Sequence, residues 1–170
     1  ISRDTLEKAG LVGEAQTRQT PREEIALVSE QVLRAVEATV PAPGRDARIV
    51  LLASARAGEG KSFAALNIAA SIAEGAGQPV VLVDTEGGEG SLTALLGQDA
   101  APGLQALRAA DGNDPASLLV PTDLPGLSVL PRGPSGPTQA VAIAPALLRL
   151  AARLPNHVFV VDTPACLEAS

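Results

Sequence analysis

Short apolar runs recur along the chain and predict buried strands. They are rich in β-branched residues and lie at 47–53, 79–84, 127–130 and 157–162. Two of the runs end in an acid, Asp84 and Asp162. Continuous apolar runs, rather than alternating ones, are typical of parallel strands that are covered on both faces.

Between these runs, apolar positions recur at helical spacing. The clearest case follows Thr20-Pro21-Arg22-Glu23, a capping box with proline in the first turn, and predicts a helix to about Thr39. An opening helix at 4–9, capped by Asp4 and ended by Gly10, is also expected. Further helices are expected at 61–74, 91–96, 103–110, 115–119 and 145–153.

Alternating strands and helices predict an α/β fold, a parallel sheet with helices on both faces. A Pro- and Gly-containing connector at 41–44 divides the chain into a helical lead-in and linker, 1–46, and a main domain, 47–170. In such sheets ligands bind at the carboxyl ends of the strands. We therefore expect the segment after residue 53, Asp84 and Asp162 to meet at one edge.

Composition narrows the functional classes. The net charge of −6 and the pI of about 4.8 leave no basic footprint for nucleic acid. The single cysteine, Cys166, excludes a disulfide framework, fits a reducing cytoplasm and is expected to be a packing residue. No run reaches membrane-spanning length and no signal peptide is visible. The chain starts at Ile1 and has no methionine, so we expect it to be part of a longer product.

The segment 54–62, Ser-Ala-Arg-Ala-Gly-Glu-Gly-Lys-Ser, predicts a phosphate-binding loop between a strand and a helix. Its glycines let the backbone approach an anion, Lys61 would reach the β- and γ-phosphates, and the Ser62 hydroxyl would bind Mg²⁺. The regular pattern has glycine where this chain has Ala55, so the match is to a variant. The alternative is a glycine turn that joins a core strand to a core helix.

Acids at the other strand ends complete the candidate site. Asp162 has the position of a Walker B acid, which orients Mg²⁺ or its water, and Asp84 and Glu86 could position an attacking hydroxyl or water. Each acid could instead cap the turn that follows it. Arg56 could reach a phosphate or remain a solvated charge. Glu59 is expected to face solvent, and the lone His157 is expected to be structural.

These residues resemble the cytoplasmic domain of bacterial tyrosine kinases of exopolysaccharide and capsule synthesis, relatives of the MinD/ParA P-loop ATPases with a deviant Walker A motif. The opening 5–12 and the helix 23–34 are similar to those of exopolysaccharide-linked members, and Leu130–Gly133 resembles a loop that precedes a helix pair. The matching motifs are Gly58–Ser62 with Asn67 (Walker A), Val81–Glu86 (Walker A′) and Val160–Pro164 (Walker B).

The resemblance implies ATP and Mg²⁺ as cofactors and ATP or ADP as ligands. It implies that the protein is located in the cytoplasm, at the inner face of the membrane through a partner. It also implies a polysaccharide co-polymerase or export protein as a partner, and possible homo-oligomers. The implied catalytic residues are Lys61, Asp84, Glu86 and Asp162, and the implied metal ligands are Ser62, Asp84 and Asp162. The implied nucleotide-binding residues are Arg56, Ala57, Gly58, Glu59, Gly60, Lys61, Ser62 and Phe63.

The chain also departs from the family pattern. The A′ motif D-x-D-x-R reads Asp84-Thr85-Glu86-Gly87-Gly88, so its second acid is longer and its arginine is absent. The ring-forming E-x-x-R-x-x-R motif is matched by Glu23, Ala26 and Ser29, and the chain contains no tyrosine. Three hypotheses remain open: a nucleotide-binding regulator with weak phosphotransfer, an active tyrosine kinase acting on a lost tail or a partner, and a MinD/ParA-like ATPase.

Overall fold

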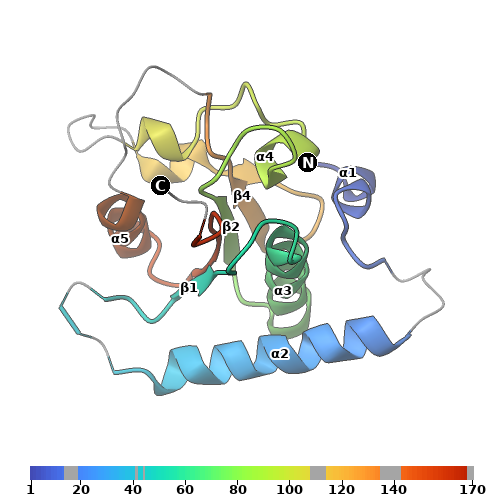
Figure 1. The fold of residues 1–170 in the computed structure, drawn as a ribbon. Coiled ribbons are helices and arrows are strands. Elements are labelled where there is room, and N and C mark those ends of the chain that lie inside the picture. Colours follow the sequence, from blue (N-terminus) through green and yellow to red (C-terminus); the bar gives the residue numbers. More distant parts are fainter. Residues whose placement is uncertain (14–18, 41, 44, 108–113, 135–142, 168–170) are drawn as a thin grey trace.

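The computed structural model describes residues 1–13, 19–40, 42–43, 45–107, 114–134 and 143–167 (Figure 1). Five strands form one sheet, in the order β1-β5-β2-β4-β3. The strands are β1 Ile49–Leu52, β2 Val80–Asp84, β3 Val120–Pro121, β4 Leu127–Leu130 and β5 Val158–Asp162. The helices are α1 Arg3–Lys8, α2 Gln19–Ala38, α3 Lys61–Ala76, α4 Leu92–Leu95 and α5 Ile143–Arg153, with 3₁₀ turns at Leu104–Ala106 and Pro115–Leu118.

The predicted parallel sheet is confirmed for its four main strands. β1, β5, β2 and β4 run parallel, and only β3 joins as an antiparallel strand at the edge. β2 and β5 are buried at every position, which is why their sequences are continuous apolar runs. Alternate residues of these strands face opposite layers.

Helices cover both faces of the sheet, as the sequence predicts. On one face, Leu82 and Val160 belong to an apolar cluster with α1 and α3; on the other, Val81 and Phe159 pack with α5. α2 lies across α3 rather than on the sheet (Figure 1). Its outward side leaves Leu27 and Val28 exposed.

The lead-in before the sheet is fastened to the helix that follows β1. Asn67 on α3 accepts a hydrogen bond from the N–H of Val12 at 2.8 Å and donates one to the carbonyl of Gly10 at 3.0 Å. The same side-chain amide donates to the carbonyl of Phe63 at 2.8 Å. Leu6 and Leu11 are buried in the same cluster as α3, so the lead-in packs against the main domain.

Several local predictions need correction. α1 is capped by Ser2, whose hydroxyl accepts the N–H of Thr5, whereas Asp4 lies inside the helix and pairs with Lys8. α2 begins at Gln19, before the expected capping residue, and the expected helix at 103–110 is a 3₁₀ turn followed by residues outside the described part. Cys166 is exposed, so its expected packing role is wrong. Within the described residues, no helix is long and apolar enough to cross a bilayer.

Candidate functional site

The carboxyl ends of three neighbouring strands meet at one edge of the sheet. Asp84 at the end of β2 is paired in register with Asp162 at the end of β5, and Leu52 at the end of β1 is paired with Asp162 on its other side. The segment 53–60 continues directly from β1 into α3. The predicted convergence of the loop, Asp84 and Asp162 is therefore confirmed.

The loop has the backbone of an anion-binding turn. Gly58 and Gly60 have φ values of 79° and 84°, a region that favours glycine. A Cβ at either position would meet nothing within 4 Å, so conformation rather than space requires glycine. α3 begins at Lys61, and the described residues supply no acceptor for the N–H groups of Gly58, Gly60, Lys61 and Ser62. These donors can bind an anion at the positive end of the helix dipole.

Behind the loop, a hydroxyl and a buried carboxylate form a pair. The Ser62 hydroxyl donates to Asp162 Oδ2 at 2.6 Å, while Asp162 Oδ1 is buried without a hydrogen-bond partner among the described residues. Burial raises the pKa of Asp162, the hydrogen bond from Ser62 opposes that shift, and the charges of Asp84 and Glu86 add to it. The Lys61 charge acts in the opposite direction. An incoming cation would relieve this unfavourable negative charge.

The donor set at this pair fits a hard cation. A hydroxyl oxygen and an unpartnered carboxylate oxygen are the ligands that Mg²⁺ prefers, completed by water and substrate oxygens. In the described part of the chain, no three His, Cys, Asp or Glu side chains come together as a metal-binding group. A cation here would therefore need ligands from bound phosphate or water.

Asp84 organises the turn that follows β2. Its Oδ1 accepts the N–H groups of Glu86 at 2.9 Å and Gly87 at 3.1 Å, and its Oδ2 accepts the N–H of Thr93 at 2.8 Å. The residue is fully buried. Three backbone bonds occupy most of the lone-pair positions of one carboxylate, so little capacity remains for a metal or a substrate hydroxyl. The alternative that Asp84 caps the next turn is thus realised in the structure.

Between the loop and this turn lies an open pocket of about 360 Å³. It is lined by Ala57, Gly58, Gly60, Lys61, Ser62, Phe63, Glu86, Glu89, Gly90 and Ser91. Seven of these ten residues belong to the candidate set from the sequence. Glu89, Gly90 and Ser91 were missed, although the glycine-rich run at 87–90 signals a turn at this place.

Other candidates lie beside the pocket rather than in its lining. Arg56 is exposed on the loop, and Asp162 lies behind Ser62. Glu59 is exposed, as predicted, but its carboxylate turns back and accepts the N–H groups of Ala55 at 3.1 Å and Arg56 at 3.2 Å. The expectation that it only faces solvent is therefore incomplete.

Arg132, two residues after the end of the neighbouring strand β4, supports the turn after β2. Its guanidinium donates to the carbonyl of Thr85 at 2.7 Å, and its N–H donates to the Thr93 hydroxyl at 2.9 Å. A Cβ at Gly87 would lie 2.6 Å from Arg132 Cγ, so the arginine stem requires glycine there. The sequence pattern does not predict this contact, because Gly87 and Arg132 are 45 residues apart.

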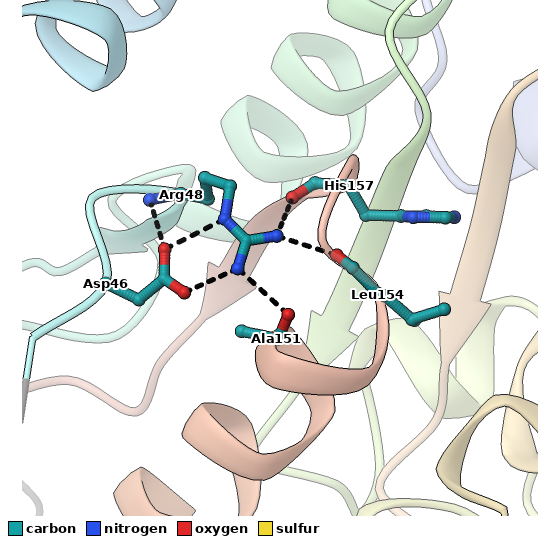
Figure 2. Close-up of polar contacts among 5 residues, drawn as sticks. All are labelled: Asp46, Arg48, Ala151, Leu154 and His157. Atoms are coloured by element: carbon teal, nitrogen blue, oxygen red, sulfur yellow. Dashed lines mark hydrogen bonds and ion pairs between the residues drawn. The ribbon is translucent and has the colours of Figure 1, made fainter. Parts of the chain in front are cut away.

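At the opposite edge of the sheet, Arg48 forms a closed network of polar contacts (Figure 2). Its guanidinium pairs with Asp46 at 2.6 Å and donates to the carbonyls of Ala151 at 2.9 Å and Leu154 at 2.6 Å at the end of α5. A longer bond of 3.4 Å reaches the carbonyl of His157. The arginine thus satisfies carbonyls that the helix end leaves without intrahelical partners.

His157 lies at this edge, at the start of β5, away from the loop. Figure 2 shows its ring pointing away from the guanidinium, and its Nδ1 is buried without a partner among the described residues. Burial lowers the pKa of His157, and the charge of Arg48 adds to that shift. Burial pushes the pKa of Asp46 upward, but its bonds to Arg48 outweigh this and lower it overall.

Comparison with known proteins shows which sequences and folds this chain is similar to. Over 149 residues, or 84% of this chain, the sequence is 33% identical to EpsB of Ralstonia solanacearum, described as a tyrosine-protein kinase. The chain spans 19% of the length of that relative. No protein-family profile matches the chain.

Solved structures give the same fold. The BceF tyrosine kinase domain matches with a TM-score of 0.67 and 22% identity, over 90% of this chain and 59% of that domain. The kinase domain of the Escherichia coli tyrosine kinase ETK matches with a TM-score of 0.53 and 24% identity, over 72% of this chain and 48% of that domain. The predicted resemblance to bacterial tyrosine-kinase domains is therefore confirmed, as is the α/β fold class.

Proposed function

We propose that this chain, which is related to bacterial tyrosine-kinase domains in sequence and in fold, binds Mg·ATP at the pocket beside its glycine loop. The observation that carries the proposal is the Ser62–Asp162 pair, which has one buried carboxylate oxygen without a partner and lies behind the amides of Gly58, Gly60 and Lys61, which likewise have no acceptor among the described residues. The loop amides would bind an anion there, and the Asp162 carboxylate would bind a cation beside it. A metal–phosphate complex supplies both.

Each residue of the loop has a distinct part in this proposal. The Lys61 ammonium, at the start of α3, offsets phosphate charge, and the amides of Gly58, Gly60 and Lys61 hold the phosphate oxygens. Ser62 and Asp162 would hold Mg²⁺, with Asp162 acting directly or through a bound water. When bound, Mg²⁺ supplies charge neutralisation and orients the phosphates.

The second half of the proposal concerns the acids after β2. Glu86 lines the pocket, whereas Asp84 is occupied by three backbone N–H groups. Glu86 is therefore the acid placed to orient an acceptor hydroxyl, and Asp84 holds the turn that carries it. Phosphotransfer also needs a tyrosine that these 170 residues do not contain, so its acceptor would lie outside them.

We therefore favour a nucleotide-binding member of regulatory type, with weak or absent phosphotransfer, over a fully active kinase. The occupied Asp84 and the missing A′ arginine support this choice. An active kinase that phosphorylates a partner or another part of the same protein is the second candidate, supported by the relative described as a tyrosine-protein kinase. The comparisons give no added support to a MinD/ParA-like ATPase.

Partners and location follow from the same relationship and remain part of the proposal. We expect the domain to act in the cytoplasm at the inner membrane face, through a polysaccharide co-polymerase or export protein. ATP- and ADP-bound forms would present different loop conformations to that partner. Self-association is possible, although the ring motif is not present on α2.

Calorimetric titration with Mg·ATP tests the central claim. The parent should bind, and Lys61→Ala should weaken binding by about 100-fold, since it removes the only ammonium at the pocket among the described residues. Lys8→Ala is the matched control, because Lys8 is the chain's other lysine and pairs with Asp4 on the surface. Binding by Lys61→Ala equal to that of the parent would refute the phosphate-loop assignment.

A transfer assay separates the two candidates. Parent protein that binds Mg·ATP is incubated with γ-labelled ATP and a tyrosine-containing peptide. Label on the peptide that disappears in Glu86→Gln supports an active kinase. Tight binding with no label supports the regulatory type.

A further inference from the structure

The first half of the glycine loop, residues 54–56, is held by hydrogen bonds to the side chain of Glu59, which lies in the second half, residues 58–62. Glu59 Oε2 accepts the N–H groups of Ala55 at 3.1 Å and Arg56 at 3.2 Å. The Ser54 hydroxyl donates to the carbonyl of Arg56 at 2.8 Å, and the N–H of Cys166 donates to the carbonyl of Ser54 at 2.9 Å. This half of the loop therefore has its polar groups engaged within the protein.

The second half of the loop is arranged differently. Gly58 and Gly60 have positive φ, line the pocket, and together with Lys61 and Ser62 present N–H groups without acceptors in the described part of the chain. Ala55, Arg56 and Glu59 do not line the pocket. The amides that the Glu59 carboxylate holds are therefore those of residues outside the pocket lining.

We infer that Glu59 is a positioning residue that braces the loop for phosphate binding; this rests on the proposed function. Its carboxylate draws the N–H groups of Ala55 and Arg56 to one side. The chain is then forced to turn at Gly58 and Gly60, so that the next N–H groups converge on the pocket. Successive N–H groups in such a turn form an anion-binding concavity.

A different role for Glu59 would be that of an internal anion that competes with phosphate. The two roles predict opposite effects of removing the side chain. A competitor bonded to the pocket-lining amides would have to leave before phosphate entered. Here the bonds are to amides outside the pocket, so phosphate can enter while Glu59 stays in place.

Three variants test the brace in Mg·ATP titrations. Glu59→Ala should weaken binding about tenfold, because two loop hydrogen bonds are lost. Glu59→Gln keeps an oxygen that can accept both N–H groups and should stay within about threefold of the parent. Glu37→Gln removes an exposed charge on α2, away from the pocket and without breaking a described hydrogen bond, and should bind as well as the parent.

Amide hydrogen exchange of the nucleotide-free protein provides a readout that does not need ATP. Exchange at Ala55 and Arg56 should accelerate in Glu59→Ala, be largely restored in Glu59→Gln, and be unchanged in Glu37→Gln. An unchanged melting temperature in all three variants would show that the fold is retained.

The results separate this inference from the proposed function. If the parent does not bind Mg·ATP, the proposed function fails, and the positioning role fails with it. If the parent binds but Glu59→Ala and Glu59→Gln both bind more tightly, Glu59 is a competitor and the brace is wrong. If Glu59→Ala leaves both binding and exchange unchanged, Glu59 is only a solvated charge and the inference is overturned.

Discussion

Two charged groups at opposite ends of the strands, the Arg48 network and the Asp162–Lys61 group, differ in how completely they are satisfied. At the amino edge, the Arg48 guanidinium contacts one carboxylate and three carbonyls, and little of its donor capacity is left. At the carboxyl edge, Asp162 keeps a buried oxygen without a partner and Lys61 has no ion pair among the described residues. The contacts of Arg48 are completed within the protein, although the nearby His157 Nδ1 has no partner among the described residues, whereas the free Asp162 oxygen and Lys61 would be satisfied by a ligand.

This contrast distinguishes structural charge from functional charge. Buried polar groups are normally paired, since an unpaired group costs free energy that folding must offset. A network whose donors and acceptors are all used within the protein stabilises the fold, as Arg48 does by joining β1 to the end of α5. A network with unused donors or acceptors indicates a place where a ligand can bind.

Removing the Arg48 side chain should give the largest effect on stability. Arg48→Ala leaves Asp46 and the carbonyls of Ala151 and Leu154 without their partner, and should lower the free energy of unfolding by about 3 kcal/mol. Its Mg·ATP affinity, measured below the unfolding transition, should match that of the parent. Urea denaturation measures the first quantity and calorimetry the second.

Arg34→Ala is the matched control for that variant. Arg34 pairs with Glu30 on the exposed side of α2, so its removal should cost less than about 0.5 kcal/mol. Equal losses for the two arginines would show that the network at the amino edge has no special role. Loss of nucleotide binding in folded Arg48→Ala would show that the two edges are not independent.

Changing Asp162 should separate the effect on stability from the effect on Mg·ATP binding. In Asp162→Asn the amide oxygen can still accept the Ser62 hydroxyl, but the charge is gone, so Mg·ATP should bind about tenfold more weakly. The nucleotide-free variant should be at least as stable as the parent at neutral pH, because a buried charge has been removed. Asp99→Asn, at an exposed acid, should change neither quantity.

The stability of the parent should also depend on pH in a way that the stability of Asp162→Asn does not. The pKa of Asp162 is raised above its ordinary value of 3.8, so as pH rises past 3.8 the unfolded chain loses its proton first. The parent should therefore lose stability across this window as pH rises, and Asp162→Asn should lack that loss. A parent and variant with parallel pH profiles would contradict the assigned shift.

His157 should show the smallest effect, with the opposite sign. Its pKa lies below the ordinary value of 6.5, so as pH falls past 6.5 the unfolded chain takes up a proton first. Stability should fall slightly across that window in the parent and less in His157→Gln. Chemical denaturation at pH 7.5 and pH 5.5 gives the comparison, and an increase in stability on acidification would refute it.

The parts of this structure that the sequence predicts well are those in which one physical effect dominates. The strands at 80–84 and 158–162 are buried on both faces, and nothing but an apolar run satisfies that environment. The loop is recognisable because positive φ, an ammonium and a hydroxyl are needed in a fixed order at a helix start.

The parts that escape prediction depend on contacts between distant segments. β3 is two residues long and contains Pro121, so it has neither periodicity nor strand propensity. The occupation of Asp84 depends on how the turn to Thr93 folds back, and the requirement for glycine at position 87 depends on Arg132, two residues after β4. The exposure of Cys166 likewise depends on where the chain leaves β5.

Two of the three hydrogen bonds of Asn67 tie the lead-in to the helix that follows the loop. Asn67 lies on the same helix as Lys61 and Ser62, and its oxygen holds the N–H of Val12. A rotation or shift of α3 must therefore change the chemical environment of that proton. In an NMR spectrum, the Val12 amide signal would report on events at the phosphate loop from a position outside the pocket, without a probe attached to any residue that binds.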